Sequence, residues 1–112
     1  MGDLIPVKVL RDFQGLAIRL TDERRNHILE HPEMVPMEPA IEETLLHPER
    51  VVRSFSDPQA RLYYRFYFRT MVGSKFLCVV VKTLDDDAFV LIAYLTDRIK
   101  KGVVLWLISN GG

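Results

Sequence analysis

The second half of the sequence alternates between two kinds of side chain, and this period constrains the fold more than any other feature. Successive side chains of a β-strand point to opposite faces of a sheet, so alternation predicts a strand with two distinct faces. Residues 61–69 read RLYYRFYFR and alternate over their whole length. Further strands are predicted at residues 50–55, 76–83, 88–96 and 103–108, with turn residues between them. We expect these strands to pair antiparallel, because the loops that join them are short.

The first half of the sequence predicts mainly helices. Two short strands are expected at residues 7–10 and 16–20. Thr21 is a suitable N-cap for a helix that ends near His31, because the proline that follows disfavours a helical conformation in the residue before it. A second helix is expected at residues 39–46. The predicted fold class is therefore α+β, with a helical N-terminal half followed by a curled antiparallel sheet.

Length and composition are those of one globular domain that needs neither a metal nor a cofactor to fold. The chain has 112 residues, of which 48% are hydrophobic and 27% charged. Its single cysteine, Cys78, lies in an apolar run and is expected to be a buried, inert thiol. No apolar run is long enough to span a bilayer, and no secretory signal is evident. We therefore expect a cytoplasmic protein that does not contact a membrane.

The formal net charge is zero, but the charges are unevenly distributed along the chain. Residues 1–46 contain nine acidic and five basic side chains, a balance of −4. Residues 47–82 contain seven basic and two acidic side chains, a balance of +5. A concentrated basic surface attracts an anionic ligand even when the whole protein is neutral.

Alternation divides residues 61–69 into two chemically different faces. The face that we expect in the core carries Leu62, Tyr64, Phe66 and Phe68. The opposite face, called the Arg/Tyr face below, carries Arg61, Tyr63, Arg65, Tyr67 and Arg69. Arginine binds phosphate and tyrosine offers a ring on which bases stack, so this face predicts an RNA-binding surface. The alternative is an ordinary solvated face in which arginine stems cover tyrosine rings.

Two histidines four residues apart share one face of the first predicted helix. His27, Glu30 and His31 form the pattern H-x-x-E-H of inverted zinc peptidases. We reject a zinc site, because a third protein ligand is missing and Pro32 ends the helix. Without a metal, a histidine can act as a general acid or base near neutral pH. The structural alternatives are a partly buried His27 and a His31 that caps the helix C-terminus.

A hydroxyl and two cations follow one another at the end of the predicted strand 88–96. They are Thr96, Arg98 and Lys100. Such groups can bind a scissile phosphate and stabilise the charge of its transition state. An ordinary polar turn is the alternative.

Four segments taken together resemble the phage-associated branch of the barnase–EndoU–colicin–RelE-like (BECR) nuclease superfamily. They are TDERRNHILEHPE (21–33), LYYR (62–65), FLCVVVK (76–82) and AYLTDRIKKG (93–102). The resemblance implies a single BECR-like domain over residues 1–112 with its core at about residues 16–106. It also implies one or two N-terminal helices packed on a curved antiparallel sheet of about four main strands, and metal-independent ribonuclease chemistry in a cleft between helix and sheet.

Carried over residue by residue, the resemblance suggests a candidate catalytic site. Its motif positions are His27 with His31 beside it, Tyr64 with Arg65, Lys82, and Thr96 with Arg98.

The predicted function is a metal-independent endoribonuclease, toxin-like and held in check by an inhibitory protein partner. In this hypothesis His27 is the general acid or base, Lys82 and Arg98 stabilise phosphate charge, and Thr96 bonds a phosphate oxygen. His31, Lys100 and the Arg/Tyr face bind the RNA substrate, with Arg65 and Tyr63 holding the neighbouring nucleotides. The first alternative is a non-catalytic RNA- or protein-binding module that uses the Arg/Tyr face. The second is a domain whose sheet edge pairs with a partner chain.

Overall fold

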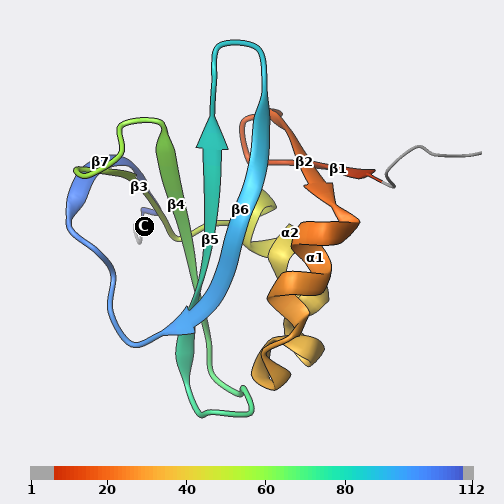
Figure 1. Ribbon diagram of the computed structural model, residues 1–112. Helices are drawn as coiled ribbons and strands as arrows, with labels where there is room; N and C mark the ends of the chain where they lie inside the picture. Colours follow the sequence, from red (N-terminus) through yellow and green to blue (C-terminus); the bar gives the residue numbers. More distant parts are fainter. Residues whose placement is uncertain (1–6, 110–112) are drawn as a thin grey trace, which may run out of the picture.

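The computed structural model describes residues 7–109, which form one seven-stranded sheet with two helices on one face (Figure 1). In chain order the elements are β1 (Val7–Arg11), β2 (Ala17–Thr21), α1 (Asp22–Leu29), a 3-10 helix (Pro32–Met37), α2 (Glu38–Leu46), β3 (Arg50–Ser54), β4 (Ala60–Tyr67), β5 (Lys75–Thr83), β6 (Ala88–Thr96) and β7 (Gly102–Leu107). Across the sheet the strands follow the order β1-β2-β6-β5-β4-β3-β7.

The sheet is larger than predicted and it is mixed, so the expected antiparallel sheet of about four main strands is wrong. β3 to β6 form the expected antiparallel meander. The N-terminal hairpin of β1 and β2 extends that sheet, because β2 runs parallel to β6 where Arg19 pairs with Phe89. At the other edge β7 pairs with β3 and not with β6, although a short loop joins β6 to β7. Nearness in the sequence therefore does not by itself determine which strands pair.

Both helices begin and end close to the predicted residues. Thr21 caps α1, its hydroxyl oxygen accepting a hydrogen bond from the backbone N–H of Arg24 at 3.2 Å. The segment before α2 forms a 3-10 helix that buries Met34 and Met37. α2 buries Ile41 and its neighbours Ala40, Thr44 and Leu45 against the sheet.

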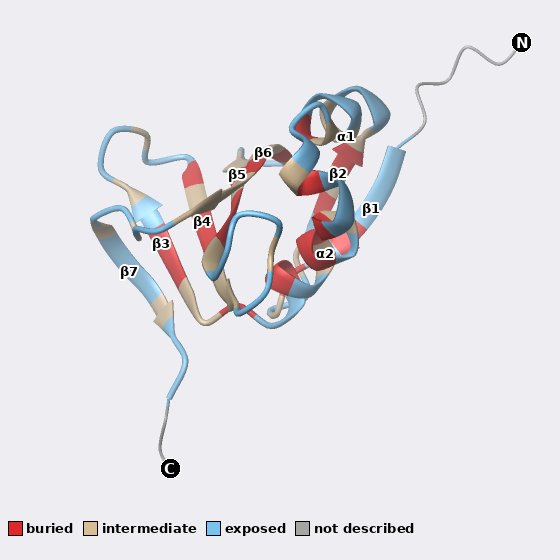
Figure 2. Cartoon of the chain, turned by 90° about the horizontal axis from the view of Figure 1, so that it is seen from below, coloured by how far each residue is buried: buried red, intermediate tan, exposed pale blue. Residues whose placement is uncertain are grey.

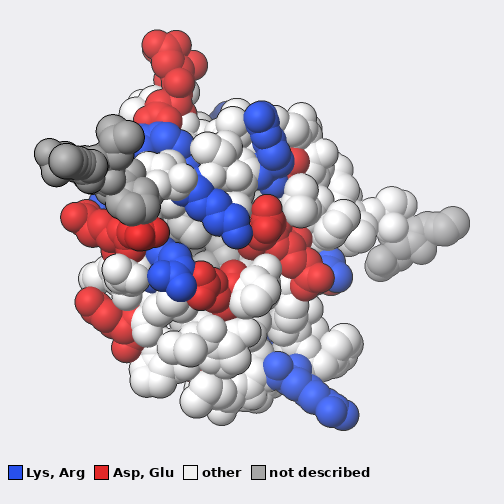
Figure 3. Space-filling view, turned by 90° about the vertical axis from the view of Figure 1, so that its right-hand side faces the viewer, with Lys and Arg blue, Asp and Glu red and all other residues white. Residues whose placement is uncertain are grey.

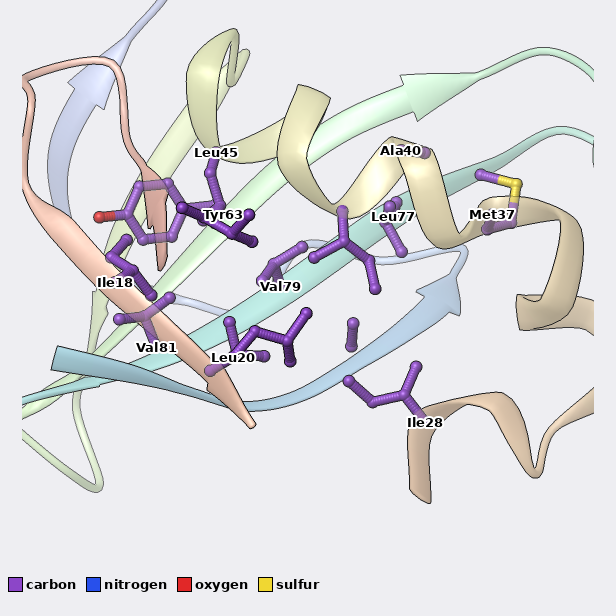
Figure 4. Packing of buried hydrophobic residues seen from close by; sticks show 14 of the residues in the cluster. Ile18, Leu20, Ile28, Met37, Ala40, Leu45, Tyr63, Leu77, Val79 and Val81 are labelled. Carbon is purple, nitrogen blue, oxygen red and sulfur yellow. The ribbon is translucent and has the colours of Figure 1, made fainter. Parts of the chain in front are cut away.

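The main hydrophobic core lies between the helices and one face of the sheet, here called the helix face. Figure 4 shows the Tyr63 ring of β4 close to Leu45 of α2 and Ile18 of β2. Tyr63 is fully buried, which corrects the prediction that the Arg/Tyr face of β4 is exposed to solvent. The prediction that Phe68 lies in the core is wrong as well, because this residue is 78% exposed. The tyrosine rings supply the apolar surface that the helices cover.

A smaller hydrophobic cluster lies on the opposite face of the sheet, here called the open face because neither helix covers it. Its buried members are Val52, Ala60, Leu62, Tyr64 and Cys78. Ile99, in the loop between β6 and β7, packs against this cluster. The predicted burial of Leu62, Tyr64 and Cys78 is therefore confirmed, but on the face away from the helices.

A buried carboxylate joins the N-terminal hairpin to the centre of the sheet. Asp12, in the turn between β1 and β2, is 2% exposed. Its carboxylate accepts hydrogen bonds from the backbone N–H groups of Gln14 and Leu16 at 2.9 Å each. The hydroxyl of Tyr63 donates a third, at 2.7 Å. Burial, with the adjacent carboxylate, raises the pKa of Tyr63, so the phenol stays protonated as this bond requires.

Replacing Tyr63 by Phe should lower the free energy of unfolding by about 1.5–3 kcal/mol, the usual value of a hydrogen bond to a charged group. Urea denaturation measures this loss. Tyr67→Phe is the matched control, because the Tyr67 hydroxyl donates to the exposed carboxylate of Glu43 at 2.6 Å. Because Glu43 is exposed and Tyr67 only partly buried, water can replace this bond, so the loss in Tyr67→Phe should stay below about 1 kcal/mol. Equal losses in the two variants would contradict the structural role of the buried pair.

Candidate functional site

The residues predicted to be catalytic are not gathered in one cleft. His27 and His31 are exposed on the helix side of the molecule, near the carboxylates of Glu30 (3.5 Å) and Glu33 (4.0 Å). Lys82 follows Val81, which points into the main core, so its side chain lies on the open face. The sheet therefore separates the histidines from Lys82.

The two remaining catalytic candidates, Thr96 and Arg98, lie at the opposite end of the sheet from Lys82. Thr96 pairs with Phe76, near the start of β5, whereas Lys82 is close to the end of that strand. Six residues of extended strand separate those two positions in β5, a distance of about 20 Å. The ammonium group of Lys82 is also not free to bind a phosphate, because it forms an ion pair with Asp57 at 2.5 Å. These candidates therefore do not form one site in this structure.

The Arg/Tyr face of β4 contacts α2 and its C-terminal turn. The Tyr67 hydroxyl is bonded to Glu43, and burial, together with this carboxylate, raises the pKa of Tyr67 to about 12. Arg65 donates from Nη1 to the carbonyl oxygen of His47 at 2.8 Å and lies within 4.0 Å of the carboxylates of Glu43 and Glu49. With Tyr63 buried, these contacts hold β4 against the helix layer. The middle of the Arg/Tyr face is not a free surface for RNA.

Arg61 and Arg69 lie at the two ends of that face. Neither forms an ion pair with a carboxylate in residues 7–109. Arg61 is partly buried and Arg69 is exposed. They are separated by the length of β4, so they do not form a common site.

The candidate site that the structure adds is a cavity of about 350 Å³ on the open face, here called the basic cavity. Its lining residues come from β3, from the following turn, from the β6–β7 loop and from β7; they are Arg50, Val52, Phe55, Ile99, Lys100, Lys101, Gly102 and Val104. A second hollow of about 540 Å³ shares Arg50 and Ile99 with it and is also lined by Glu49, Tyr64 and Phe76.

The β6–β7 loop brings the lysines beside β3. The loop runs from the end of β6 to β7 at the far edge of the sheet (Figure 1). The backbone N–H of Lys100 donates to the Tyr64 hydroxyl at 3.0 Å, which fixes the loop on the sheet. Gly102 then approaches β3 so closely that a Cβ atom there would lie 2.3 Å from the carbonyl oxygen of Arg53. Any larger residue at this position would push the loop away.

The basic cavity has an unbalanced positive charge. Arg50, Lys100 and Lys101 line it, and no carboxylate does. None of the three forms an ion pair within the described part of the chain. One aromatic ring, that of Phe55, lines the same cavity, and this residue is 70% exposed. A planar ring beside three cations suits a ligand that is both anionic and aromatic.

On the helix side of the molecule, several cations are paired with carboxylates. Arg25 pairs with Glu38, and Lys8 lies 4.0 Å from Glu42. In Figure 3, which views the molecule from the side of β1 and the helices, acidic and basic side chains are interspersed. The paired cations contribute little net field that would attract an anion.

Sequence reasoning found one residue of the basic cavity and missed the others. Lys100 was predicted to bind substrate, and it lines the cavity. Arg50 and Lys101 were not singled out, because nothing in the sequence shows that β7 returns to pair with β3. The available signals were the +5 balance of residues 47–82, which includes Arg50, and the Lys100-Lys101-Gly102 run after an apolar strand.

Comparison of the chain with protein-family models, with curated protein sequences and with solved structures gives no match. None of the helices in residues 7–109 is both long and apolar enough to cross a membrane. Within the same residues no three His, Cys, Asp or Glu side chains are grouped so that they could hold a metal ion.

Cys78 lies in the sheet beneath the candidate site and should be chemically inert in the folded protein. Burial raises the pKa of this thiol to about 11, and hydrogen bonds from Tyr94 and Tyr64 only partly offset that shift. The reactive thiolate is therefore scarce at neutral pH. A disulfide reagent such as Ellman's reagent should not modify Cys78 in native protein and should modify it fully in urea. Rapid modification without denaturant would show that this part of the sheet opens.

Proposed function

We propose that this chain is a non-catalytic RNA-binding module that holds single-stranded RNA in the basic cavity on the open face of its sheet. The observation that carries the proposal is the set of three unpaired cations, Arg50, Lys100 and Lys101, around a cavity with no carboxylate. Unpaired cations that converge on one cavity attract an anion, and phosphate groups are anions that arginine and lysine bind well.

A nucleic acid explains the lining better than an acidic protein does. Phe55 lines the cavity together with the cations, so one nucleotide can place its phosphate on the cations and its base on the ring. Phe68 offers a second exposed ring on the same strand face as Leu62 and Tyr64. Bases are free to stack on such rings only in a single strand, which favours single-stranded over double-stranded RNA. RNA is also a ligand available to the cytoplasmic protein that the sequence suggests.

Binding without cleavage is proposed because the cavity has no group placed for proton transfer. Cleavage of RNA without a metal needs a general acid and a general base at the scissile phosphate. No histidine and no carboxylate lines the basic cavity, and His27 and His31 lie on the other side of the sheet. The metal-independent endoribonuclease activity that the sequence suggests stays a prediction, and the experiment below measures cleavage as well as binding.

The test is the affinity of the protein for a fluorescently labelled single-stranded RNA, measured by anisotropy at several salt concentrations. Each phosphate contact contributes about 0.7 to the slope of log K against log salt for a single strand. A variant with Arg50→Ala, Lys100→Ala and Lys101→Ala should therefore bind at least tenfold more weakly and have a slope shallower by about two. The side chain of Lys100 is removed without affecting its backbone N–H, so the loop keeps its bond to Tyr64.

The matched control is the double variant Arg24→Ala and Arg69→Ala, which removes cations that form no ion pair and lie outside the cavity. It should leave both affinity and slope unchanged. Equal weakening of both variants, or no RNA binding by the wild type, would overturn the proposal. The RNA recovered from each sample, incubated with EDTA, should be intact on a denaturing gel. Cleavage that is lost in His27→Ala would instead support the endoribonuclease.

A further inference from the structure

The outer edge of β7 is open and apolar. β7 pairs with β3 along one side, and within residues 7–109 no strand pairs with its other side. Residues 103–108 read VVLWLI and contain neither a charge nor a proline. Val104 is 53% exposed, and Val103, Leu105, Leu107 and Ile108 are exposed too. Figure 2 shows β7 mostly in the colour of exposed residues, on the side of the sheet away from the helices.

Exposed sheet edges usually have structural features that prevent pairing with another chain. Charged side chains, prolines, bulges and very short strands are the common ones. The other edge of this sheet, β1, carries Lys8 and Arg11. β7 has a bulge where it pairs with β3, but none of its six residues is charged. Its free backbone groups and apolar side chains therefore offer a template for another β-strand.

We infer that β7 pairs antiparallel with β7 of a second copy of this chain, joining two sheets into one. An uncharged strand suits its own copy, because self-pairing opposes no like charges. The basic residues that precede the strand select the direction. Parallel pairing would bring Lys100 and Lys101 of both copies to the same end of the strand pair. Antiparallel pairing places the two lysine pairs at opposite ends, about 20 Å apart for a strand of six residues.

This arrangement also closes after two copies. Antiparallel pairing of identical strands is a two-fold, isologous contact that uses the open edge of both chains at once. The outer edges of the joint sheet are then the two β1 strands, which carry Lys8 and Arg11. These charges oppose further edge-to-edge growth. The expected assembly is therefore a dimer and not a fibre.

The pairing has a consequence that rests on the proposed function. A two-fold axis that pairs two strands antiparallel is perpendicular to the sheet, so both copies present the same face on the same side. Gly102 and Val104 of β7 line the basic cavity, so the two cavities would lie on one surface, close to the shared edge. One RNA strand long enough to reach both cavities would then bind more tightly than a short one.

The test is the molar mass of the purified protein in solution, measured without RNA by size-exclusion chromatography with light scattering. The wild type should have twice the 13.0 kDa mass of one chain. Leu105→Lys places a charge on the proposed interface at a residue that is 41% exposed and does not line the basic cavity. This variant should be a monomer. Val9→Lys, at a 53% exposed residue of the opposite edge, is the matched control and should remain a dimer.

A monomeric wild type would overturn the inference, as would a dimer that survives Leu105→Lys or dissociates with Val9→Lys. Circular dichroism and urea denaturation establish that both variants are folded. Hydrogen exchange provides a second readout on the wild type, because the backbone N–H groups on the outer side of β7 should be protected only in the dimer. These measurements use no RNA, so a dimer that fails to bind RNA contradicts the proposed function alone.

Discussion

The buried hydrogen bond between Asp12 and Tyr63 determines where the N-terminal half of the chain lies. The hairpin of β1 and β2 meets the rest of the sheet through a short parallel contact, in which Arg19 is paired with Phe89. The Asp12 carboxylate shapes the hairpin turn and holds it on β4, and the backbone N–H of Phe13 donates to Leu45 of α2 at 2.9 Å. Because the chain passes directly from β2 into α1, the position of this turn also sets the position of the helix layer.

The two faces of the sheet use the same kinds of residue for different purposes. On the helix face, Arg65 donates from Nη1 to the carbonyl oxygen of His47, and the Tyr67 hydroxyl donates to Glu43, so both side chains are tied to α2 and its C-terminal turn. On the open face, Arg50 and the lysines of the β6–β7 loop have no carboxylate partner among the described residues. The zero net charge of the sequence therefore conceals a cavity on the open face that is lined by unpaired cations. Charge that the fold leaves unpaired, and not charge counted along the chain, indicates the site.

The sequence predicted the local structure well and the long-range pairing poorly. Strand positions followed from alternation and turn residues, and the start of α1 from its Thr21 cap, because these signals depend on neighbours in the chain. The parallel contact of β2 with β6 and the return of β7 to β3 depend on packing between distant segments, for which the sequence has no local signal. Strand order in turn decides which loops meet, so the basic cavity could not be foreseen, except for Lys100.

The alternation of β4 was recognised correctly, but the Arg/Tyr face was wrongly expected to be exposed to solvent. Tyrosine has an apolar ring and a polar end, so a row of arginines and tyrosines fits either a solvated surface or a buried layer that bonds to a helix. Tyr63 shows which applies, because Asp12 supplies the partner that lets its hydroxyl be buried. That partner lies in a turn far away in the sequence, and alternation carries no information about it.

The strand order has a further consequence for a chain that is still being translated. β3 is made early, but β7, its neighbour at the edge, follows only after β4, β5 and β6. Until the ribosome has released residues 102–107, Val51 and Val52 of β3 lie in a strand whose outer edge has no partner, although both are buried in the finished protein. Edges of this kind are where incomplete chains aggregate. Protection of the nascent sheet by a chaperone would therefore matter most during the interval between the synthesis of β3 and that of β7.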